Sequence, residues 1–409
     1  MSEWKEIDFA KVLEDESISY GIVQPGPHVE IDGIPIVRVQ NIKNGKIIPD
    51  DIKKVHKDIE SSYLRTRLKG GELLITVVGS VGECAIVTND FIGWNVARAV
   101  SVARIKNTFD KEFIRYCFAT EDLKFQMYGN TNDTVQPTLN LKELKTLKLL
   151  IPELPEQKAI AEVLSSLDDK IDLLHRQNKT LEQMAETLFR QWFVEEAKED
   201  WDYIELGGFI KCYNGVSYKS SELNPSDIAM VTLKSFARDG SFRLDGFKEF
   251  TGNFKAVHIV KQGDLVVAHT DITQDAALVG NPVLVIGIEE YKTLIISMDL
   301  VKVEPKFKWM SKEFLYFLMK SRIFKQHCLG YANGSTVLHL SKDAIPTFEF
   351  FLPPKDKIEE FSKHASWLLN KKNLNISQIR SLEKLRDTLL PKLMSGEVIL
   401  NMKNKDYEN

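Results

Sequence analysis

An internal repeat is the feature that most constrains the fold of this 409-residue chain. Identical or similar dipeptides recur in the same order at a constant separation of 201 positions. The matched pairs are Glu112-Phe113 with Glu313-Phe314, Ile151-Pro152 with Leu352-Pro353, Leu181-Glu182 with Leu382-Glu383, and Thr187-Leu188 with Thr388-Leu389. This period is much longer than the repeats of solenoid proteins, so each copy is expected to be a domain followed by a connector.

Each copy changes its pattern once along its length. Residues 1–150 and 200–350 contain short β-branched and aromatic runs, broken by Gly, Asn and Asp, which predict strands. The clearest runs are 34–39, 73–78, 99–105, 264–268 and 300–303. Apolar residues at helical spacing predict short helices at 111–119 and 311–320. The predicted fold class is therefore α+β, with two α/β domains.

A heptad pattern follows each domain and predicts two long helices. Apolar residues recur at alternating steps of four and three, which is the pattern of a coiled-coil seam. The seam of the first copy, within about 156–193, is formed by Ile160, Leu164, Leu167, Ile171, Leu174, Asn178, Leu181, Ala185, Leu188 and Trp192. The equivalent positions of the second copy are Phe361, Ala365, Leu368, Lys372, Asn375, Ile379, Leu382, Arg386, Leu389 and Leu393.

These two helices are expected to pair, because an isolated helix with such a seam would expose an apolar stripe to water. We predict antiparallel pairing, which gives a long two-helix coiled coil between the domains and a pseudo-twofold internal repeat. Aligning the seams at their midpoints places Asn178 opposite Asn375. A hydrogen bond between these amides would fix the register at some cost in stability. Two amides that simply face water are an equally good interpretation of the sequence.

Composition and charge describe a globular chain with 43% hydrophobic and 27% charged residues. No apolar run is long enough to span a membrane, and no signal-peptide pattern occurs at residues 1–10. Four widely separated cysteines without zinc-site spacing favour a reduced, cytoplasmic setting and no structural metal. The net charge of −4 counts against a simple DNA-binding interpretation. Residues 43–69 and 302–325 are locally basic, which fits phosphate contacts or two ordinary solvated faces.

Sequence motifs for catalysis are missing. The chain has no GxxxxGK[ST] phosphate-binding loop, so ATP hydrolysis is not expected. No Asn-Pro-Pro-aromatic or Asp-Pro-Pro-aromatic run is present, which by resemblance argues against a methyltransferase pocket. His269 and His339 have no nucleophile motif beside them, so structural or DNA-contacting roles are favoured over catalysis.

Three segments of the predicted long helices, residues 154–161, 181–193 and 385–398, resemble the specificity subunits of type I restriction-modification systems. Residues 154–161 with 181–193 resemble the central conserved region of that family, and residues 385–398 resemble its distal one. Residues 33–42 and the pattern Ile75-x-x-x-Gly79-Ser80-x-Gly82 resemble its target-recognition domains. The chain departs from the pattern at residues 353–357, where the second helix begins differently from the first.

This resemblance implies a non-catalytic subunit in which each domain reads half of a split, asymmetric site on double-stranded DNA. It implies partners: methyltransferase subunits, expected to be two, and restriction or motor subunits. Those partners would carry S-adenosylmethionine for adenine-N6 methylation, ATP and Mg²⁺, whereas this chain would bind no cofactor. The expected boundaries are 1–152 and 196–353 for the target-recognition domains, 153–195 and 354–398 for the helical spacers, and 399–409 for the tail.

Candidate DNA contacts are polar residues beside turns at similar places of the two copies, because such side chains can read base edges or bind phosphates. For the first copy we predict Gln40, Asn41, Lys43, Lys46, Thr76, Ser80, Arg98, Thr134 and Gln136. For the second copy we predict Lys219, Lys234, Ser235, His269, Thr270, Asn333, Ser335 and Thr336. Each of them could equally be an ordinary turn or capping residue.

Three other interpretations remain open at this point. The chain could be a specificity-like subunit of a related methyltransferase–nuclease system, a DNA-modifying enzyme with unfamiliar motifs, or an assembly scaffold whose domains bind protein. Modification of DNA by the chain without partners would favour the enzyme. Salt-dependent affinity for one split DNA site would exclude the pure scaffold.

Overall fold

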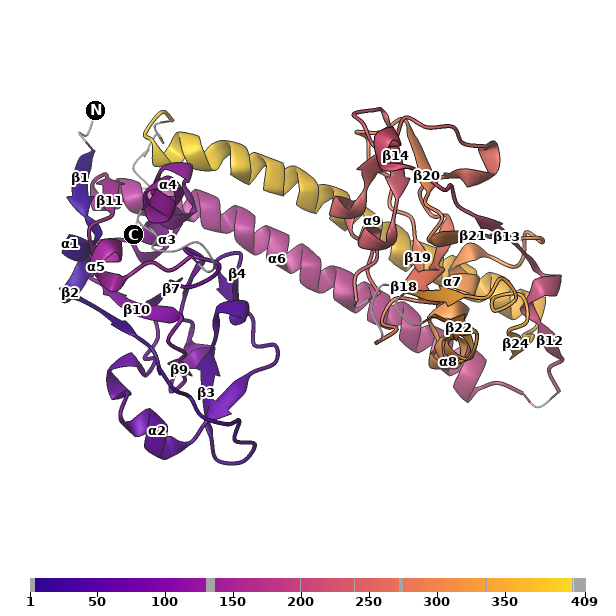
Figure 1. Ribbon diagram of the computed structural model, residues 1–409, viewed down its shortest axis with the longest axis horizontal. Helices are drawn as coiled ribbons and strands as arrows, with labels where there is room; N and C mark the ends of the chain where they lie inside the picture. Colours follow the sequence, from indigo (N-terminus) through magenta and orange to yellow (C-terminus); the bar gives the residue numbers. More distant parts are fainter. Residues whose placement is uncertain are drawn as a thin grey trace, which may run out of the picture. The chain divides into compact units, whose positions relative to one another are not determined.

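The computed structural model describes residues 4–129, 137–198, 200–238, 240–271, 275–334, 337–398 and 400. The chain forms two compact units, each with its own core. Unit 1 consists of Met1–Leu173 with Ile379–Asn409, and unit 2 consists of Leu174–Gln378. Both units are mixed assemblies of sheets and helices, as the strand and helix patterns predict (Figure 1).

Unit 1 is built around a four-stranded antiparallel sheet with smaller sheets beside it. The four strands are, in order across the sheet, β2 (Leu13–Tyr20), β10 (Val100–Ile105), β7 (Leu73–Thr76) and β8 (Cys84–Ile86). The smaller sheets are β1 (Lys5–Asp8) with β11 (Lys148–Ile151), β6 (Lys53–Val55) with β3 (Ile34–Val37) and β9 (Asn95–Val96), and β4 (Ile42–Lys43) with β5 (Lys46–Ile47). The short helices are α1 (Phe9–Val12), α2 (Lys57–Ser61), α3 (Lys111–Ala119), α4 (Glu121–Gly129) and α5 (Leu141–Lys145).

Unit 2 repeats this plan. Its equivalent sheet contains β13 (Ile210–Asn214), β21 (Leu300–Pro305), β17 (Leu265–Ala268) and β19 (Pro282–Leu284), in that order. A two-stranded sheet pairs β12 (Tyr203–Glu205) with β24 (Glu349–Phe351). A second four-stranded sheet contains, in order, β15 (Lys248–Glu249), β14 (Ile228–Val231), β20 (Thr293–Ile296) and β16 (Ile259–Val260). A three-stranded sheet contains β18 (Thr270–Asp271), β23 (Leu338–Leu340) and β22 (Ala332–Asn333). Its short helices are α7 (Lys312–Lys320) and α8 (Arg322–Gly330).

The repeat extends to individual helix caps. Asp110 caps α3 by accepting a hydrogen bond from the backbone N–H of Phe113 at 2.9 Å. Ser311, 201 positions later, caps α7 in the same way through the N–H of Phe314 at 3.0 Å. Such a cap satisfies a backbone donor that the first helical turn leaves unpaired. The two phenylalanines then lie fully buried, at 0% and 1% exposure, in the cores of unit 1 and unit 2 respectively.

Two long helices complete the fold. Helix α6 (Leu154–Arg190) continues into a π-helical turn at Gln191–Glu195, and α9 spans Lys355–Met394. Within each unit, segments of α6 and α9 lie side by side (Figure 1). In unit 2, Asn178 faces Asn375 and Phe189 packs on Phe361, so rising numbers on one helix meet falling numbers on the other. The pairing is therefore antiparallel, as predicted.

The predicted hydrogen bond across the seam is present. The side-chain nitrogen of Asn375 donates to the Asn178 side-chain oxygen at 3.0 Å. Both amides are buried, with 8% exposure for Asn178 and 1% for Asn375. The interpretation that both face water is therefore wrong. A buried amide retains its stability only when a partner replaces the lost water, and each of these residues supplies that partner to the other.

The remaining seam residues are all buried or half-buried. Those of α6 and the π-helical turn after it are Ile160, Leu164, Leu167, Ile171, Leu174, Leu181, Leu188 and Trp192. Those of α9 are Phe361, Leu368, Ile379, Leu382, Leu389 and Leu393. Helix α6 also contributes Phe189, outside the predicted seam, which packs against Phe314 of α7 at a ring-centroid distance of 5.7 Å. The helices therefore form part of the cores of both units.

Candidate nucleic-acid interface

The hairpin of β4 and β5 carries two of the predicted DNA contacts of unit 1, Lys43 and Lys46. Asn44 and Gly45 connect the strands, both with positive φ (52° and 77°), which is the conformation of the tight turns that match strand twist. A Cβ at position 45 would lie 2.3 Å from a guanidinium nitrogen of Arg115, so that side chain would have to shift, and the positive φ of Gly45 further favours glycine. Gln40 and Lys43, on either side of the start of this hairpin, are exposed.

Lys46 is placed differently from Lys43 on the same hairpin. Its ammonium nitrogen lies 3.1 Å from an Asp172 carboxylate oxygen and 3.8 Å from one of Asp169, and its side chain is 43% exposed. Both aspartates belong to α6. The predicted DNA contact Lys46 therefore ties the hairpin to the long helix through ion pairs, whereas the side chain of Lys43 is exposed.

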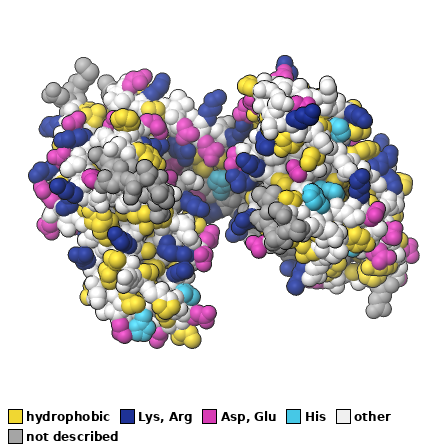
Figure 2. Space-filling model, viewed as in Figure 1, with side chains coloured by type: hydrophobic (Ala, Val, Ile, Leu, Met, Phe, Trp, Pro, Cys, Tyr) yellow, Lys and Arg dark blue, Asp and Glu magenta, His cyan; other side chains and the backbone are white. Residues whose placement is uncertain are grey.

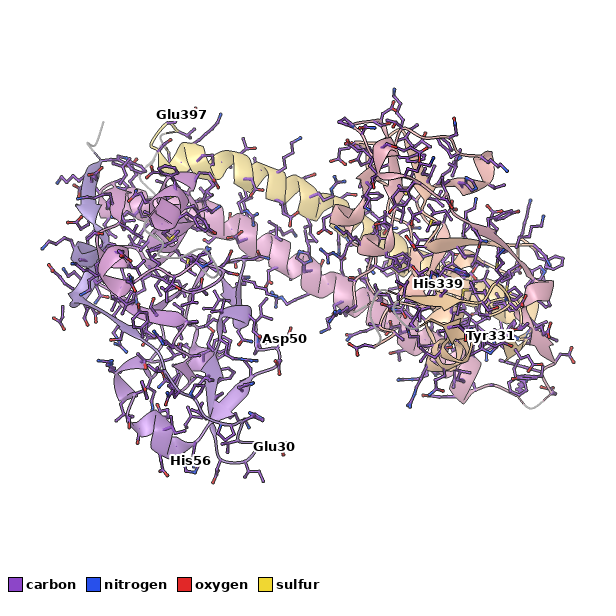
Figure 3. All side chains as sticks on the ribbon, in the orientation of Figure 1. Glu30, Asp50, His56, Tyr331, His339 and Glu397 are labelled. Atoms are coloured by element: carbon purple, nitrogen blue, oxygen red, sulfur yellow. The ribbon has the colours of Figure 1, made fainter. Side chains whose placement is uncertain are left out.

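Asn41 and Thr76 support turns and do not lie on the surface. Asn41 is 1% exposed, and its amide donates to the backbone carbonyls of Ile48 at 3.1 Å and Asp50 at 2.7 Å (Asp50 is labelled in Figure 3). Thr76 is fully buried, and its hydroxyl donates to the carbonyls of Ser80 and Glu83. Neither side chain is accessible, so we no longer interpret these two residues as base contacts. They support the turns that carry the exposed residues Gln40 and Ser80.

Unit 2 presents its candidate residues on separate segments. Lys219, Lys234 and Asn333 are exposed. Ser235 is fully buried and accepts a hydrogen bond from the N–H of Thr232, so it is corrected to a turn support. Thr270 is 4% exposed and donates to Asp299 at 3.1 Å, which corrects it in the same way.

His269 immediately precedes strand β18 and is half-buried. Burial is the main cause that lowers the pKa of His269, and the neighbouring charges of His339 and Lys342 lower it further. The ring is therefore neutral at pH 7, and its buried Nε2 atom has no hydrogen-bond partner among the described residues. His339 lies on β23 opposite Thr270 and is exposed (Figure 3).

Of the other candidates, Arg98 follows β9 and is exposed. Its backbone N–H is bonded to the carbonyl of Ile22 at 2.9 Å, so the base of the side chain is fixed. The predicted contacts Thr134, Gln136, Ser335 and Thr336 lie outside the described residues. Lys and Arg side chains are mixed with Asp and Glu over the visible face of each unit (Figure 2). This mixture agrees with the net charge of −4 and shows no large cationic field on that face.

Charged contacts that no sequence pattern predicts connect α3 and α7 to the long helices. In unit 1, Tyr116 of α3 donates to Asp168 of α6 at 2.6 Å, and Arg386 of α9 donates to the same carboxylate at 3.1 Å. Arg115 also lies 3.4 Å from Asp168. Burial raises the pKa of the Tyr116 hydroxyl, which therefore stays a proton donor.

Unit 2 uses a different set of residues for the same contact. Tyr316 of α7 donates to Glu182 of α6 at 2.6 Å, and Lys320 and Lys372 both pair with that carboxylate. Burial alone would raise the pKa of Glu182, but the two ammonium groups outweigh it and lower the pKa to about 2. At the 201-residue step, Tyr316 corresponds to Arg115 and not to Tyr116. Only the structure therefore shows that the two networks are alike.

Among the described residues, no group of three or more His, Cys, Asp or Glu side chains could hold a metal ion. No helix of the described part is long and apolar enough to cross a membrane. A polar cavity of about 310 Å³ in unit 1 lies beside the β4–β5 turn and is lined by Arg115, Tyr116, Asp168 and Arg386, which already bond to one another.

Comparison with known proteins agrees with this architecture. The family described as "Type I restriction modification DNA specificity domain" matches residues 27–183. The MjaIX specificity subunit of Methanocaldococcus jannaschii is 24% identical, with 97% of this chain and 96% of that protein covered. The HindI specificity subunit of Haemophilus influenzae is 23% identical, with 97% and 100% covered. The chain is related to the type I specificity subunits.

Two further comparisons extend this relationship. The EcoBI specificity subunit of Escherichia coli is 28% identical over 49% of this chain, and the match spans 43% of that protein. The crystal structure of a type I restriction-modification S subunit from M. genitalium has a TM-score of 0.61, with 15% identity and 96% of each chain covered. At that identity the structural match shows the fold alone, and the fold is that of a specificity subunit.

Proposed function

We propose that the chain is the DNA-reading specificity subunit of a type I restriction-modification complex. Unit 1 reads one half of a split DNA site and unit 2 reads the other half. The observation that carries this proposal is the duplicated scaffold: the same four-stranded sheet and helix caps occur twice, whereas the exposed turns differ. Two domains that share a scaffold but differ in their exposed turns can each recognise a different half-site.

The exposed side chains supply the chemistry that reading requires. Gln40 and Asn333 carry amides that can bond adenine edges, and Arg98 carries a guanidinium that can bond guanine. Lys43, Lys219 and Lys234 are exposed cations suited to phosphates. The mixed surface charge in Figure 2 supports a division of labour in which neighbouring subunits also surround the DNA.

Methylation and cleavage would be performed by partners. We propose that two methyltransferase subunits bind this chain and carry S-adenosylmethionine, and that restriction subunits carry ATP and Mg²⁺. Apolar side chains exposed on the long helices of unit 2 support a docking role. Trp367 and Leu374, seven residues apart on one side of α9, are each 66% exposed, and Met184 of α6 is 53% exposed. Exposed apolar stripes of this kind mark protein interaction surfaces.

The test is sequence-specific binding by the assembled complex. The chain is co-purified with its methyltransferase subunits, and bound DNA is selected from a random duplex pool. The proposal expects one split sequence with two unlike halves and an affinity that falls as salt rises. Selection of no common sequence would refute it. Methylation by the isolated chain with S-adenosylmethionine would refute the non-catalytic assignment.

A further inference from the structure

Strands β4 and β5 form a two-stranded sheet of their own, joined by a two-residue turn. The turn consists of Asn44 and Gly45, and the positive φ of both residues is that of a type I′ turn. Ile42 and Ile47, which pair across the sheet, are buried in unit 1 with 1% and 8% exposure. The core therefore fixes the base of the hairpin, below the tip formed by residues 43–46.

Arg115 of α3 supports the tip from one side. Its side chain is 10% exposed, and its Nε atom donates to Glu112 at 2.6 Å. Its Nη2 atom donates to Asp168 of α6 at 3.4 Å. Its Nη1 atom lies nearest to the Cβ position of Gly45. The backbone of the turn thus lies against a guanidinium that two carboxylates hold in place through charge-assisted hydrogen bonds.

Lys46 connects the tip to α6 directly. Its ammonium nitrogen lies 3.1 Å from Asp172 and 3.8 Å from Asp169, and β4 lies close to α6 in Figure 1. An exposed ion pair contributes little to stability alone, so this contact adds to that of Arg115. The buried isoleucines, Arg115 and Lys46 together give the tip one defined position in unit 1.

Unit 2 contains a similar contact. Gly240 has φ 83°, and its Cβ position lies 3.7 Å from a side-chain carbon of Lys320. Lys320 donates to Glu182 of α6, as Arg115 donates to Asp168. In both units a turn glycine with positive φ therefore lies against a cation that is itself bonded to α6. The contact belongs to the duplicated plan of the fold.

Asn44 provides an exposed amide at this fixed tip. Among the described residues, its side chain has no hydrogen-bond partner. The amide of Gln40, in contrast, donates to Asp51 at 3.1 Å. The neighbouring Lys43 is an exposed cation suited to a phosphate. An unpaired amide can donate and accept at the edge of an adenine without first breaking a contact within the chain.

The conformation of the turn does not require this amide. Glycine adopts positive φ at less cost than asparagine, and Gly-Gly suits a type I′ turn as Asn-Gly does. A substitution of Asn44 by glycine therefore removes the amide and keeps the turn. Its effect on DNA binding separates a chemical role of Asn44 from a purely conformational one.

From this geometry we infer that Asn44 is a specificity-determining residue of unit 1, whose amide bonds the edge of an adenine in the half-site that this unit reads. The inference rests on the proposed function. Arg115 and Lys46 are positioning residues in this arrangement, because they act on DNA through the tip that they hold. Loss of the amide should alter the base preference at one position of one half-site.

The experiment compares Asn44→Gly with the matched control Asp15→Gly in the complex with methyltransferase subunits. Asp15 is also exposed in unit 1 and has φ 51°, so the control replaces a residue of the same conformation. Bound sequences are selected from a random duplex pool for both variants and the wild type. In Asn44→Gly, the preference for adenine is expected to fall about fivefold or more at one position, as expected for loss of a bidentate amide–adenine contact.

Asp15→Gly should select the wild-type sequence with the wild-type preferences. If the wild type selects no sequence, the proposed function fails. If the wild type selects a split site and Asn44→Gly selects it with the same preferences, the role of Asn44 is refuted, whatever the affinity. A lower affinity with unchanged preferences would indicate a phosphate contact instead.

Loss of preference in both half-sites also refutes the role of Asn44, because that result indicates a general structural defect. Thermal unfolding of Asn44→Gly should match that of the wild type, since glycine suits the turn. Should it differ, Asn44→Asp is measured against the same criteria. Aspartate also tolerates this conformation but lacks the N–H donor of the amide.

Discussion

Asn375 donates its side-chain amide to Asn178 at 3.0 Å inside the paired helices of unit 2. Both residues occupy seam positions that elsewhere carry mainly apolar side chains. A buried amide facing a hydrocarbon would lose its hydrogen bonds, so this pair favours one alignment of α6 with α9. Asn375 also donates to Gln177 at 3.4 Å, which extends the polar contact to the edge of the seam.

Removal of one amide should therefore destabilise the chain more than removal of both. Asn375→Ala leaves the buried Asn178 amide unpaired, and we expect the free energy of unfolding to fall by about 1–3 kcal/mol. The double variant Asn178→Leu with Asn375→Leu should recover most of that loss, because two apolar side chains pack without unpaired groups. Denaturant unfolding measures both effects. Asn370→Ala, at an exposed position of α9, serves as control.

The Glu182 network predicts a pH-dependent stability. The pKa of Glu182 is lowered to about 2 in the folded chain. A lowered pKa stabilises the fold at pH values above the unfolded pKa, near 4.5, and this contribution is lost as the pH falls toward 2. Glu182→Gln should therefore be destabilised by roughly 3 kcal/mol at pH 7, since one pKa unit corresponds to about 1.4 kcal/mol.

The difference between Glu182→Gln and the wild type should shrink as the pH is lowered from about 5 to 2. Thermal unfolding at a series of pH values measures it. The exposed Glu359→Gln is the matched control and should differ little from the wild type at each pH. A difference that stays constant over this range would contradict the ion-pair explanation.

The two lysines of the β4–β5 hairpin should behave differently in DNA binding. Lys43 is exposed, so Lys43→Ala should weaken binding similarly for all sequences and reduce the salt dependence by about one phosphate contact. Lys46 is already paired with Asp172, so Lys46→Ala should change the salt dependence less. Binding of the complex to one duplex at several salt concentrations tests this contrast. Equal salt slopes for the two variants would count against it.

Assembly should depend on the exposed helix face of unit 2. Trp367→Glu and Leu374→Glu are expected to weaken binding of methyltransferase subunits by about tenfold or more, because buried aromatic and apolar anchors dominate interfaces. Thermal unfolding of the isolated chain should be unchanged, since both side chains are 66% exposed. Lys363→Glu, at another exposed position of α9, controls for added charge. Co-purification with the partner subunits is the measurement.

Trp367 and Leu374 are not positions of the predicted seam. Charged substitutions at seam positions such as Leu167 and Leu181 would not test assembly, because both leucines are half-buried. A charge there would act first on the folding of the chain. Exposure is a property of the folded helix pair, and the heptad pattern identifies only the residues that face the partner helix. Only the structure shows which residues lie on the exposed face of the long helices.

The sequence predicted the short helices and strands that depend on a few neighbouring residues. The helix expected at 111–119 is α3 (Lys111–Ala119), and the one at 311–320 is α7 (Lys312–Lys320), because apolar spacing and caps coincide there. Helix α4 was missed. It exposes Phe125 at 80%, so its apolar residues do not line one face. The run at 34–39 ends as a strand at Val37, because Val39–Asn41 forms a 3₁₀ turn.

The candidate site was predicted less well than the fold, for a physical reason. Asn41, Thr76, Ser235 and Thr270 are polar residues beside turns, a pattern shared by DNA-contacting and turn-supporting side chains. Only tertiary packing shows that all four are buried. The partners of Lys124 and Lys325 were equally hidden: these lysines are 201 positions apart, yet Lys124 pairs with Glu121 of its own helix and Lys325 donates to the carbonyl of Val279.

Matching backbone hydrogen bonds close a turn after β7 in unit 1 and a turn after β17 in unit 2, which bears on how such a chain can change. Backbone hydrogen bonds close the turn at Ala268 and Gly280 whatever lies between them, as they do at Thr76 and Gly82. The entropy of closing a loop rises only slowly with its length. Insertions at this point therefore add little conformational cost and leave the sheet register intact. New surface loops can be grafted there in one unit while the core of the other keeps its sequence.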